Sequence, residues 1–129
     1  MKKVLIIEDN DQNMYLMTFI LEKYGYEVIA AREGVEGIAA AQLTGPDLIL
    51  LDIQLPVMDG YAVAKQLRLN PSLVKTPIIA VTSYAMPGDR EKALEAGCDG
   101  YIEKPINPDT FISQVESFPA RDMHGKVQS

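Results

Sequence analysis

The chain has 129 residues, which is the usual length of one domain and too short for two ordinary ones. Its composition, 47% hydrophobic and 23% charged, is typical of a globular protein and excludes a wholly disordered chain. The net charge of -6 argues against sequence-independent binding to nucleic acid, and no apolar run reaches the length of about 20 residues that a membrane span needs.

The N-terminus and the cysteine content indicate a compartment. A basic start leads into only four apolar residues, Val4–Ile7, before two acidic residues, and this stretch is too short for the core of a signal peptide. The single cysteine, Cys98, cannot form an internal disulfide, as is usual in a reducing cytoplasm, and we interpret it as a small packed residue. We therefore expect a cytoplasmic protein.

Strand-like apolar blocks alternate with segments of helical spacing along the chain. Five blocks are predicted to be strands: Val4–Ile7, Val28–Ala31, Leu48–Leu51, Ile78–Val81 and Gly100–Ile102. The first, third and fourth are continuously apolar, which is typical of strands that are covered on both faces.

Between these blocks, apolar residues three and four positions apart predict helices. The spacing is shown by Met14, Met17, Leu21 and Tyr24, by Gly60, Val63, Ala64 and Leu67, and by Phe111, Val115 and Phe118. Gly25, Gly45 and Gly97 are placed to end helices in a left-handed conformation. Asp59 is placed to cap the third helix, and Asn107–Pro108 to open the last one.

Five β/α units predict an α/β sandwich with a central parallel sheet and helices on both of its faces. We expect this domain to span residues 1–119, and residues 120–129 to form a loose polar tail. The only histidine, His124, lies in that tail. A phosphodonor histidine normally belongs to a helical bundle, so we interpret His124 as inert.

Polar residues follow the predicted strands at the edge where open parallel sheets bind ligands. They are Glu8 and Asp9 after the first strand, Asp52 after the third, Thr82 after the fourth and Lys104 after the fifth. Each one alone could be a loop residue, a strand-end residue or, for Asp9, the cap of the first helix. Their convergence from four chain segments predicts one site.

The chemistry of that set points to phosphoryl binding. Three carboxylates close together repel one another unless a cation intervenes. Hard oxygen ligands at a shallow site suit Mg²⁺. A divalent ion together with a lysine and a hydroxyl can bind a phosphoryl group, because the negative charge of that group is spread over its oxygens.

Four segments, in this order and at these spacings, resemble the receiver domain of two-component response regulators from Lys3 to about Phe118. They are Val4–Asn10, Asp47–Gly60, Ile78–Ser83 and Gly97–Pro105. The resemblance implies the flavodoxin-like strand order 2-1-3-4-5, which periodicity alone cannot establish. Within the family, Asp9–Asn13 and Asp52–Pro56 resemble the stand-alone regulators of the cell-division or hybrid-kinase-partner kind.

The resemblance also implies a role for each acidic residue. Asp52 is then the phosphoacceptor, which receives the group from a phosphohistidine of a histidine kinase or a histidine phosphotransfer protein. Mg²⁺ is held by Glu8, Asp9, Asp52 and the backbone carbonyl of Gln54. Lys104 pairs with the phosphoryl group, next to a cis peptide bond to the proline that follows.

A switch follows from the same resemblance. Thr82 is the switching hydroxyl, and Tyr101 is the aromatic that turns inward when Thr82 engages the phosphoryl oxygens; its residue type alone favours a half-buried packing role. The signal leaves through the fourth helix, fifth strand and fifth helix toward a target that the sequence does not name. We expect a phosphoacceptor rather than a turnover enzyme, with no nucleic-acid or membrane partner.

Three other readings remain open. A Mg²⁺-dependent phosphohydrolase with an aspartyl nucleophile would need a second acid two residues after Asp52, where this chain has Gln54. A flavin-binding module would need a hydroxyl-rich loop after the first strand, where acidic residues would repel phosphate. A degenerate receiver would only bind partners.

We also predict that Tyr84, two residues after Thr82, shields an acyl phosphate on Asp52 from water.

Overall fold

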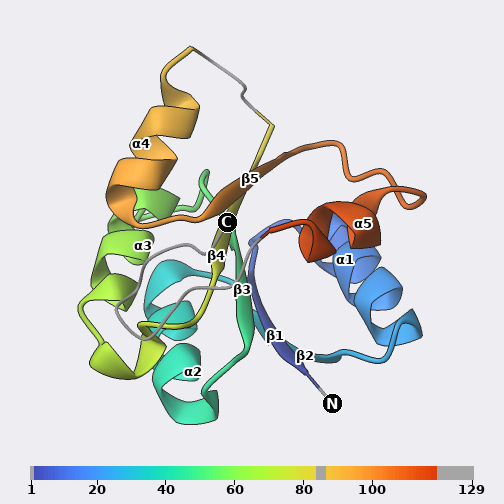
Figure 1. Ribbon diagram of the computed structural model, residues 1–129, viewed down its shortest axis with the longest axis horizontal. Helices are drawn as coiled ribbons and strands as arrows, with labels where there is room; N and C mark the ends of the chain where they lie inside the picture. The colour runs from blue at the N-terminus through green and yellow to red at the C-terminus, as the bar shows by residue number, and fades with distance from the viewer. Residues whose placement is uncertain (1, 84–86, 119–129) are drawn as a thin grey trace.

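The structure, a computed structural model, describes residues 2–83 and 87–118 and contains one sheet of five parallel strands. The strands are β1 (Lys3–Ile7), β2 (Glu27–Ala31), β3 (Leu48–Asp52), β4 (Ile78–Thr82) and β5 (Gly100–Glu103). Their order in the sheet is β2-β1-β3-β4-β5, which confirms the flavodoxin-like arrangement (Figure 1). The predicted tail, with His124, and Tyr84 lie outside the described residues.

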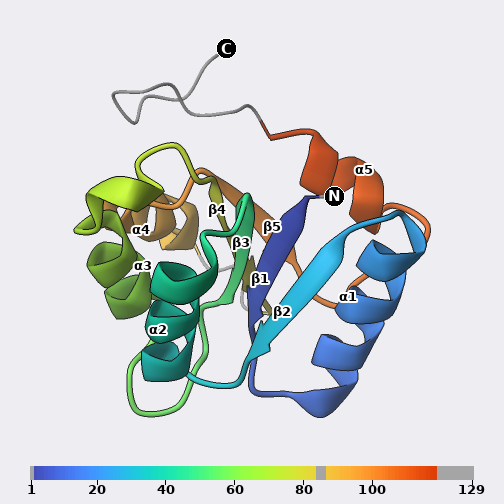
Figure 2. The ribbon, with the colours of Figure 1, turned by 90° about the horizontal axis from the view of Figure 1, so that it is seen from below.

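Helices cover both faces of the sheet, as expected. α1 (Asp11–Lys23) and α5 (Phe111–Glu116) lie on one face, whereas α2 (Gly34–Thr44), α3 (Gly60–Arg68) and α4 (Asp89–Ala96) lie on the other (Figures 1 and 2). A short 3₁₀ helix, η1 (Pro71–Leu73), precedes β4. Within the described part of the chain, none of these helices has the length and apolar character needed to cross a membrane.

The two faces of the sheet carry separate cores, and this explains the continuous apolar runs. Along β1, Val4 and Ile6 pack with α1 and α5, and Leu5 and Ile7 pack on the side of α2, α3 and α4. All four side chains are fully buried. Burial of each such side chain stabilises the fold by roughly 1.5 to 3 kcal/mol. The central strands are therefore firmly packed, and the polar residues that follow them are held in place.

Most of the predicted helix ends are confirmed. Gly45 and Gly97 end α2 and α4 with φ of 57° and 108°, and Gly25, with φ of 89°, follows the cap residue of α1. The carboxylate of Asp59 accepts from the backbone N–H of Ala62 at 3.0 Å and so caps α3.

Three details of the predicted helices are wrong. Phe118 lies beyond the last helix, which ends at Glu116. Tyr24 is not part of the buried stripe of α1, because the helix ends at Lys23 and the tyrosine is 59% exposed. The last helix begins at Phe111 rather than at Asn107–Pro108. The side chain of Asn107 accepts from Asp109 N at 2.9 Å, so the chain forms a turn there before the regular helix starts.

Candidate functional site

The polar residues expected at the strand ends do meet at one edge of the sheet. Asp52 is aligned with Val81 on β4, and Thr82 is aligned with Glu103 on β5, so that Lys104 follows directly. An open cleft lies at this edge and is lined by Glu8, Asp9, Asn10, Asn13, Asp52, Gln54, Ser83, Lys104 and Pro105. The charged members of this set were predicted from the sequence, whereas Asn10 and Ser83 were not predicted as site residues.

Lys104 is the positive centre of the cleft. Its Nζ lies 2.8 Å from Glu8 Oε1 and 3.4 Å from Asp52 Oδ2, and its side chain is only 10% exposed. The backbone places it there, because Lys104 N–H donates to the carbonyl of Thr82 at 2.7 Å. The peptide bond from Lys104 to Pro105 is cis, as expected. A fixed ammonium group therefore faces the carboxylate of Asp52.

The three carboxylates form a cluster that fits a divalent cation. Glu8, Asp9 and Asp52 each offer one oxygen, and these oxygens lie within 4.8 Å of one another. Glu8 and Asp52 are buried, whereas Asp9 is exposed. The side-chain cap of α1 is Asn10, whose Oδ1 accepts from Asn13 N at 2.9 Å, so the alternative role of Asp9 as that cap is wrong.

One carboxylate oxygen supports the cation site most directly. Glu8 Oε1 is buried and accepts no aligned hydrogen bond, although Lys104 Nζ is 2.8 Å away. The short distance makes this contact an ion pair, and the oxygen has no other partner among the described residues. Hard carboxylate oxygens in this state suit Mg²⁺.

The same crowding perturbs the acidity of Glu8. The pKa of its carboxyl group is raised to about 7, chiefly by burial and then by the nearby carboxyl group of Asp52, whereas Lys104 and the N–H of Asn10 act in the opposite direction. A divalent cation in the cluster would favour the ionised form, so binding of the cation and of a proton at Glu8 compete.

Thr82 lies at the end of β4, the strand next to that of Asp52, and Gln54 lies in the loop that follows Asp52. Thr82 is buried at the end of β4, 3% exposed. Gln54 N–H donates to Asp52 Oδ1 at 2.9 Å, which holds the Asp52 carboxylate in one orientation. Its side-chain Oε1 accepts from Ser83 Oγ at 2.7 Å. The sequence carried no signal for the contact between Gln54 and Ser83.

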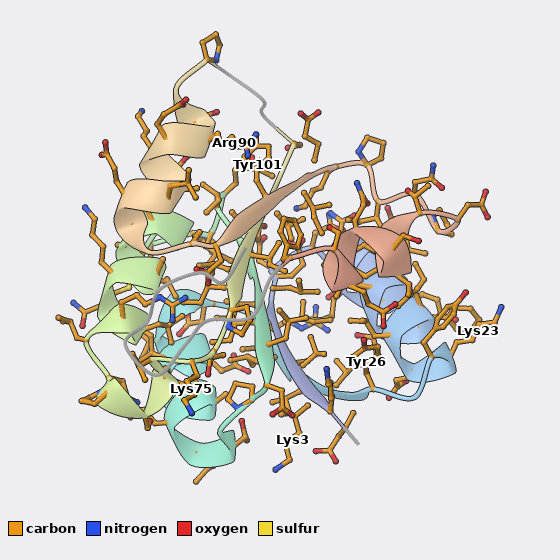
Figure 3. All side chains as sticks on the ribbon, viewed as in Figure 1. Lys3, Lys23, Tyr26, Lys75, Arg90 and Tyr101 are labelled. Carbon is orange, nitrogen blue, oxygen red and sulfur yellow. The ribbon has the colours of Figure 1, made fainter. Side chains whose placement is uncertain are left out.

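Tyr101 lies away from the carboxylates, on β5. It is half-buried and packs against the core on the side of α3 and α4. Together with Arg90, Leu94 and Phe118 it lines a hollow beside α4, and Figure 3 shows it next to Arg90. Burial raises the pKa of its phenol group, helped by the charges of Glu103 and Asp89.

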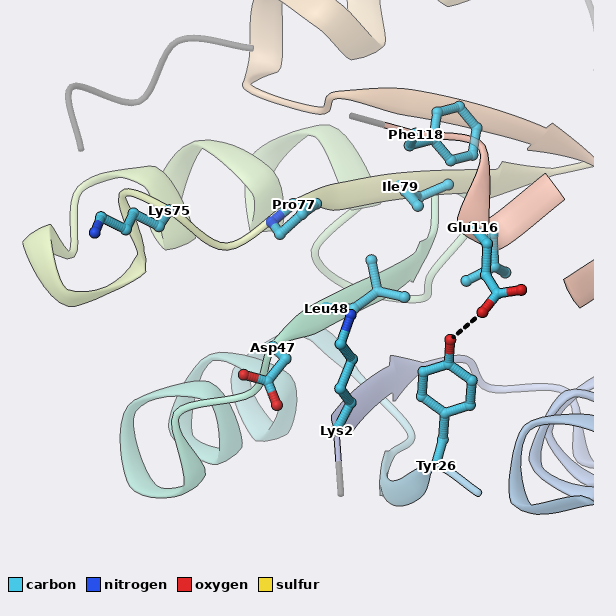
Figure 4. A pocket seen from close by; sticks show the side chains of 10 residues that line it. Lys2, Tyr26, Asp47, Leu48, Lys75, Pro77, Ile79, Glu116 and Phe118 are labelled. Atoms are coloured by element: carbon cyan, nitrogen blue, oxygen red, sulfur yellow. Dashed lines mark hydrogen bonds between the residues drawn. The ribbon is translucent and has the colours of Figure 1, made fainter. Parts of the chain in front are cut away.

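A more enclosed hollow lies at the opposite edge of the sheet, among residues at the amino ends of β3 and β4 (Figure 4). Leu48, Ile79 and Phe118 supply its apolar surface. Tyr26 donates from its hydroxyl to Glu116 Oε2 at 3.0 Å on its rim. It contains none of the convergent carboxylates, so the open cleft at Asp52 is the better candidate for chemistry.

Comparison with known proteins agrees with this geometry. The family model described as response regulator receiver domain matches residues 4–116. The chain is 45% identical over 117 residues to the polar-differentiation response regulator DivK of Brucella ovis, covering 91% of this chain and 95% of that protein. That similarity also bears out the finer resemblance to stand-alone regulators.

Solved structures of the same kind superpose on the whole domain. The chemotaxis protein CheY4 of Vibrio cholerae matches with a TM-score of 0.88 and 31% identity, over 92% of this chain and 98% of that one. The receiver domain of a sensor histidine kinase from Pseudomonas aeruginosa matches with a TM-score of 0.83 and 32% identity, over 91% and 96%. In that structure a magnesium ion is coordinated in the active site cleft.

Proposed function

Because this chain belongs to the response regulator receiver family, we propose that it is a signalling switch in which Asp52 accepts a phosphoryl group. The donor would be a phosphohistidine on a histidine kinase or a histidine phosphotransfer protein. The observation that carries the proposal is the pairing of the buried Asp52 carboxylate with Lys104, 3.4 Å away, inside a cluster of three carboxylates. Receiver domains are signalling proteins rather than classical enzymes, and this one would promote only its own phosphorylation and dephosphorylation.

The residues of the cleft suit an in-line transfer. A carboxylate oxygen of Asp52 attacks phosphorus, the bond from phosphorus to the imidazole nitrogen breaks, and its electron pair stays on the imidazole. Lys104 offers its positive charge to the phosphoryl oxygens as charge develops on them. The hydrogen bond from Gln54 N–H keeps the acceptor oriented during the approach.

Mg²⁺ would be held by Glu8, Asp9, Asp52 and the backbone carbonyl of Gln54, and it would neutralise charge on the phosphoryl oxygens. The buried Glu8 Oε1 supports this assignment, because it accepts no aligned hydrogen bond. The magnesium ion in the cleft of the related kinase receiver domain is consistent with it.

The response would pass from Thr82 to the surface formed by α4, β5 and α5. Thr82 lies one position beyond the residue aligned with Asp52, and its carbonyl binds Lys104 N–H, so a shift at Thr82 reaches β5 directly. Tyr101 on β5 is the residue whose rotation would report that shift, and it already borders the hollow beside α4. Partner binding would change through this surface.

The alternatives have less support. Gln54 occupies the place where a phosphohydrolase of this type needs a general acid, and its carboxamide is engaged by Ser83 rather than directed as a proton donor. The acidic loop after β1 would repel the phosphate of a flavin.

We further propose that the domain works in the cytoplasm and that it spans residues 1–119.

A labelling experiment tests the function. Wild-type protein is incubated with ³²P-labelled acetyl phosphate and Mg²⁺, and compared with Asp52→Asn and with the matched variant Asp109→Asn, whose carboxylate is exposed outside the cleft. We expect acid-stable label on the wild type and on Asp109→Asn, and none on Asp52→Asn. Label on Asp52→Asn, or none on the wild type, would overturn the proposal.

A further inference from the structure

The acceptor carboxylate is covered, although a phosphoryl donor has to reach it. The side chain of Asp52 is 3% exposed, and that of its partner Lys104 is 10% exposed. Attack on phosphorus requires direct contact between a carboxylate oxygen and the donor. Access of the donor to Asp52 therefore depends on the side chains that line the cleft with it.

Two side chains join the loops that border the acceptor. Ser83 Oγ donates to Gln54 Oε1 at 2.7 Å, and the backbone N–H of Ser83 donates to the same oxygen at 3.4 Å. Gln54 belongs to the loop after β3 and Ser83 to the segment after β4, and both line the cleft. The hydrogen bond between them therefore ties the two loops together beside the acceptor.

Gln54 is anchored at both of its ends. Its backbone N–H binds Asp52 Oδ1 at 2.9 Å, and its carboxamide oxygen is held by Ser83. The side chain between these anchors lines the cleft together with Asp52 and Ser83. Without the hydroxyl of Ser83, its rotatable bonds would regain their freedom, because the remaining N–H contact at 3.4 Å is weak.

We propose that the hydrogen bond between Ser83 and Gln54 is a latch that controls access to Asp52. The proposal rests on the proposed function, since it concerns the phosphoryl group on that residue. In the latched state the Gln54 side chain obstructs both a small phosphodonor and the water that would hydrolyse the acyl phosphate. Ser83 is then a positioning residue, which acts through Gln54 and takes no part in bond making.

A latch has a kinetic signature that a local loss of stability lacks. It scales the rate of phosphoryl uptake and the rate of hydrolysis by the same factor, so the plateau of phosphorylation at a fixed donor concentration stays unchanged. An ordinary hydrogen bond shifts an opening equilibrium by a factor of about 2 to 10. Ser83→Ala should therefore accelerate both rates about 2- to 10-fold.

The test measures both rates on the full chain with labelled acetyl phosphate and Mg²⁺, following hydrolysis after the donor is removed. Ser83→Thr keeps the hydroxyl and should retain wild-type rates. Ser72→Ala is the matched control, because Ser72 Oγ donates to Asn70 Oδ1 at 2.8 Å on η1, outside the cleft. It should leave both rates unchanged.

Gln54→Leu provides the second arm, since leucine keeps most of the bulk but cannot accept a hydrogen bond. In that background Ser83→Ala should have no further effect, which is the non-additivity of a coupled pair. The latch is overturned if labelled Ser83→Ala protein reacts at wild-type rates, if only one of the two rates changes, or if the effect of Ser83→Ala persists in Gln54→Leu. Wild-type protein that takes up no label would instead overturn the proposed function, and the latch with it.

Discussion

The buried carboxyl group of Glu8 makes the stability of the metal-free protein depend on pH. Its pKa is raised from 4.5 to about 7, chiefly by burial and then by Asp52. Between these two values the folded protein holds a proton that the unfolded chain releases. Stability from this group is therefore complete below pH 4.5 and is lost as the pH rises through 7.

The size of the effect follows from that interval. At about 1.4 kcal/mol per pH unit, the difference between 4.5 and about 7 corresponds to roughly 3 kcal/mol of unfolding free energy. Glu8→Gln has nearly the shape of the protonated side chain and does not titrate. We expect it to match the wild type near pH 5 and to exceed it by up to about 3 kcal/mol at pH 8, without metal.

Urea unfolding in EDTA, followed by circular dichroism from pH 5 to 8, measures this difference. The exposed Glu22→Gln on α1 serves as the matched control. Millimolar Mg²⁺ should stabilise the wild type more at pH 8 than at pH 5, because metal and proton compete, and this gain should shrink in Glu8→Gln. A difference between wild type and Glu8→Gln that does not vary with pH would refute the reasoning.

Three shorter predictions concern other residues. Val57 is fully exposed at a φ of 67°, so Val57→Gly should raise the unfolding free energy by about 1 kcal/mol, and a lower urea midpoint would contradict this. A Cβ on Gly60 would lie 2.5 Å from Ile53 Cα, so Gly60→Ala should cost roughly 1 to 3 kcal/mol in the same assay. Burial raises the pKa of Cys98 to about 12, so iodoacetamide at pH 8 should modify it only after unfolding.

Much of the fold could be predicted because its signals are local. The continuous apolar runs of β1, β3 and β4 reflect strands buried on both faces, and Gly45 and Gly97 mark helix ends by their left-handed conformation. The start of the last helix was predicted wrongly at Asn107, because the signal there is ambiguous. The side chain of Asn107 binds the backbone two residues ahead, and the sequence does not say whether such a bond opens a helix or a separate turn.

The identity of the site residues was readable for a related reason. Parallel strands end at the same edge, so residues that follow them meet wherever the strands lie side by side. Glu8, Asp52 and Lys104 could therefore be placed together from the sequence alone. The strand order came from family resemblance, because hydrophobic periodicity carries no information about which strands are neighbours.

Other features of the site could be seen only in the tertiary structure, because they depend on distances between segments that are remote in sequence. Three features are set by how loops from different strands meet: the ion pair of Glu8 with Lys104, the capping of α1 by Asn10 rather than Asp9, and the hydrogen bond from Ser83 to Gln54. The sequence by itself determined which chemical groups reach the edge of the sheet. Packing determined which of them are desolvated, paired or shielded, because these properties depend on every neighbouring atom rather than on the pattern of one segment.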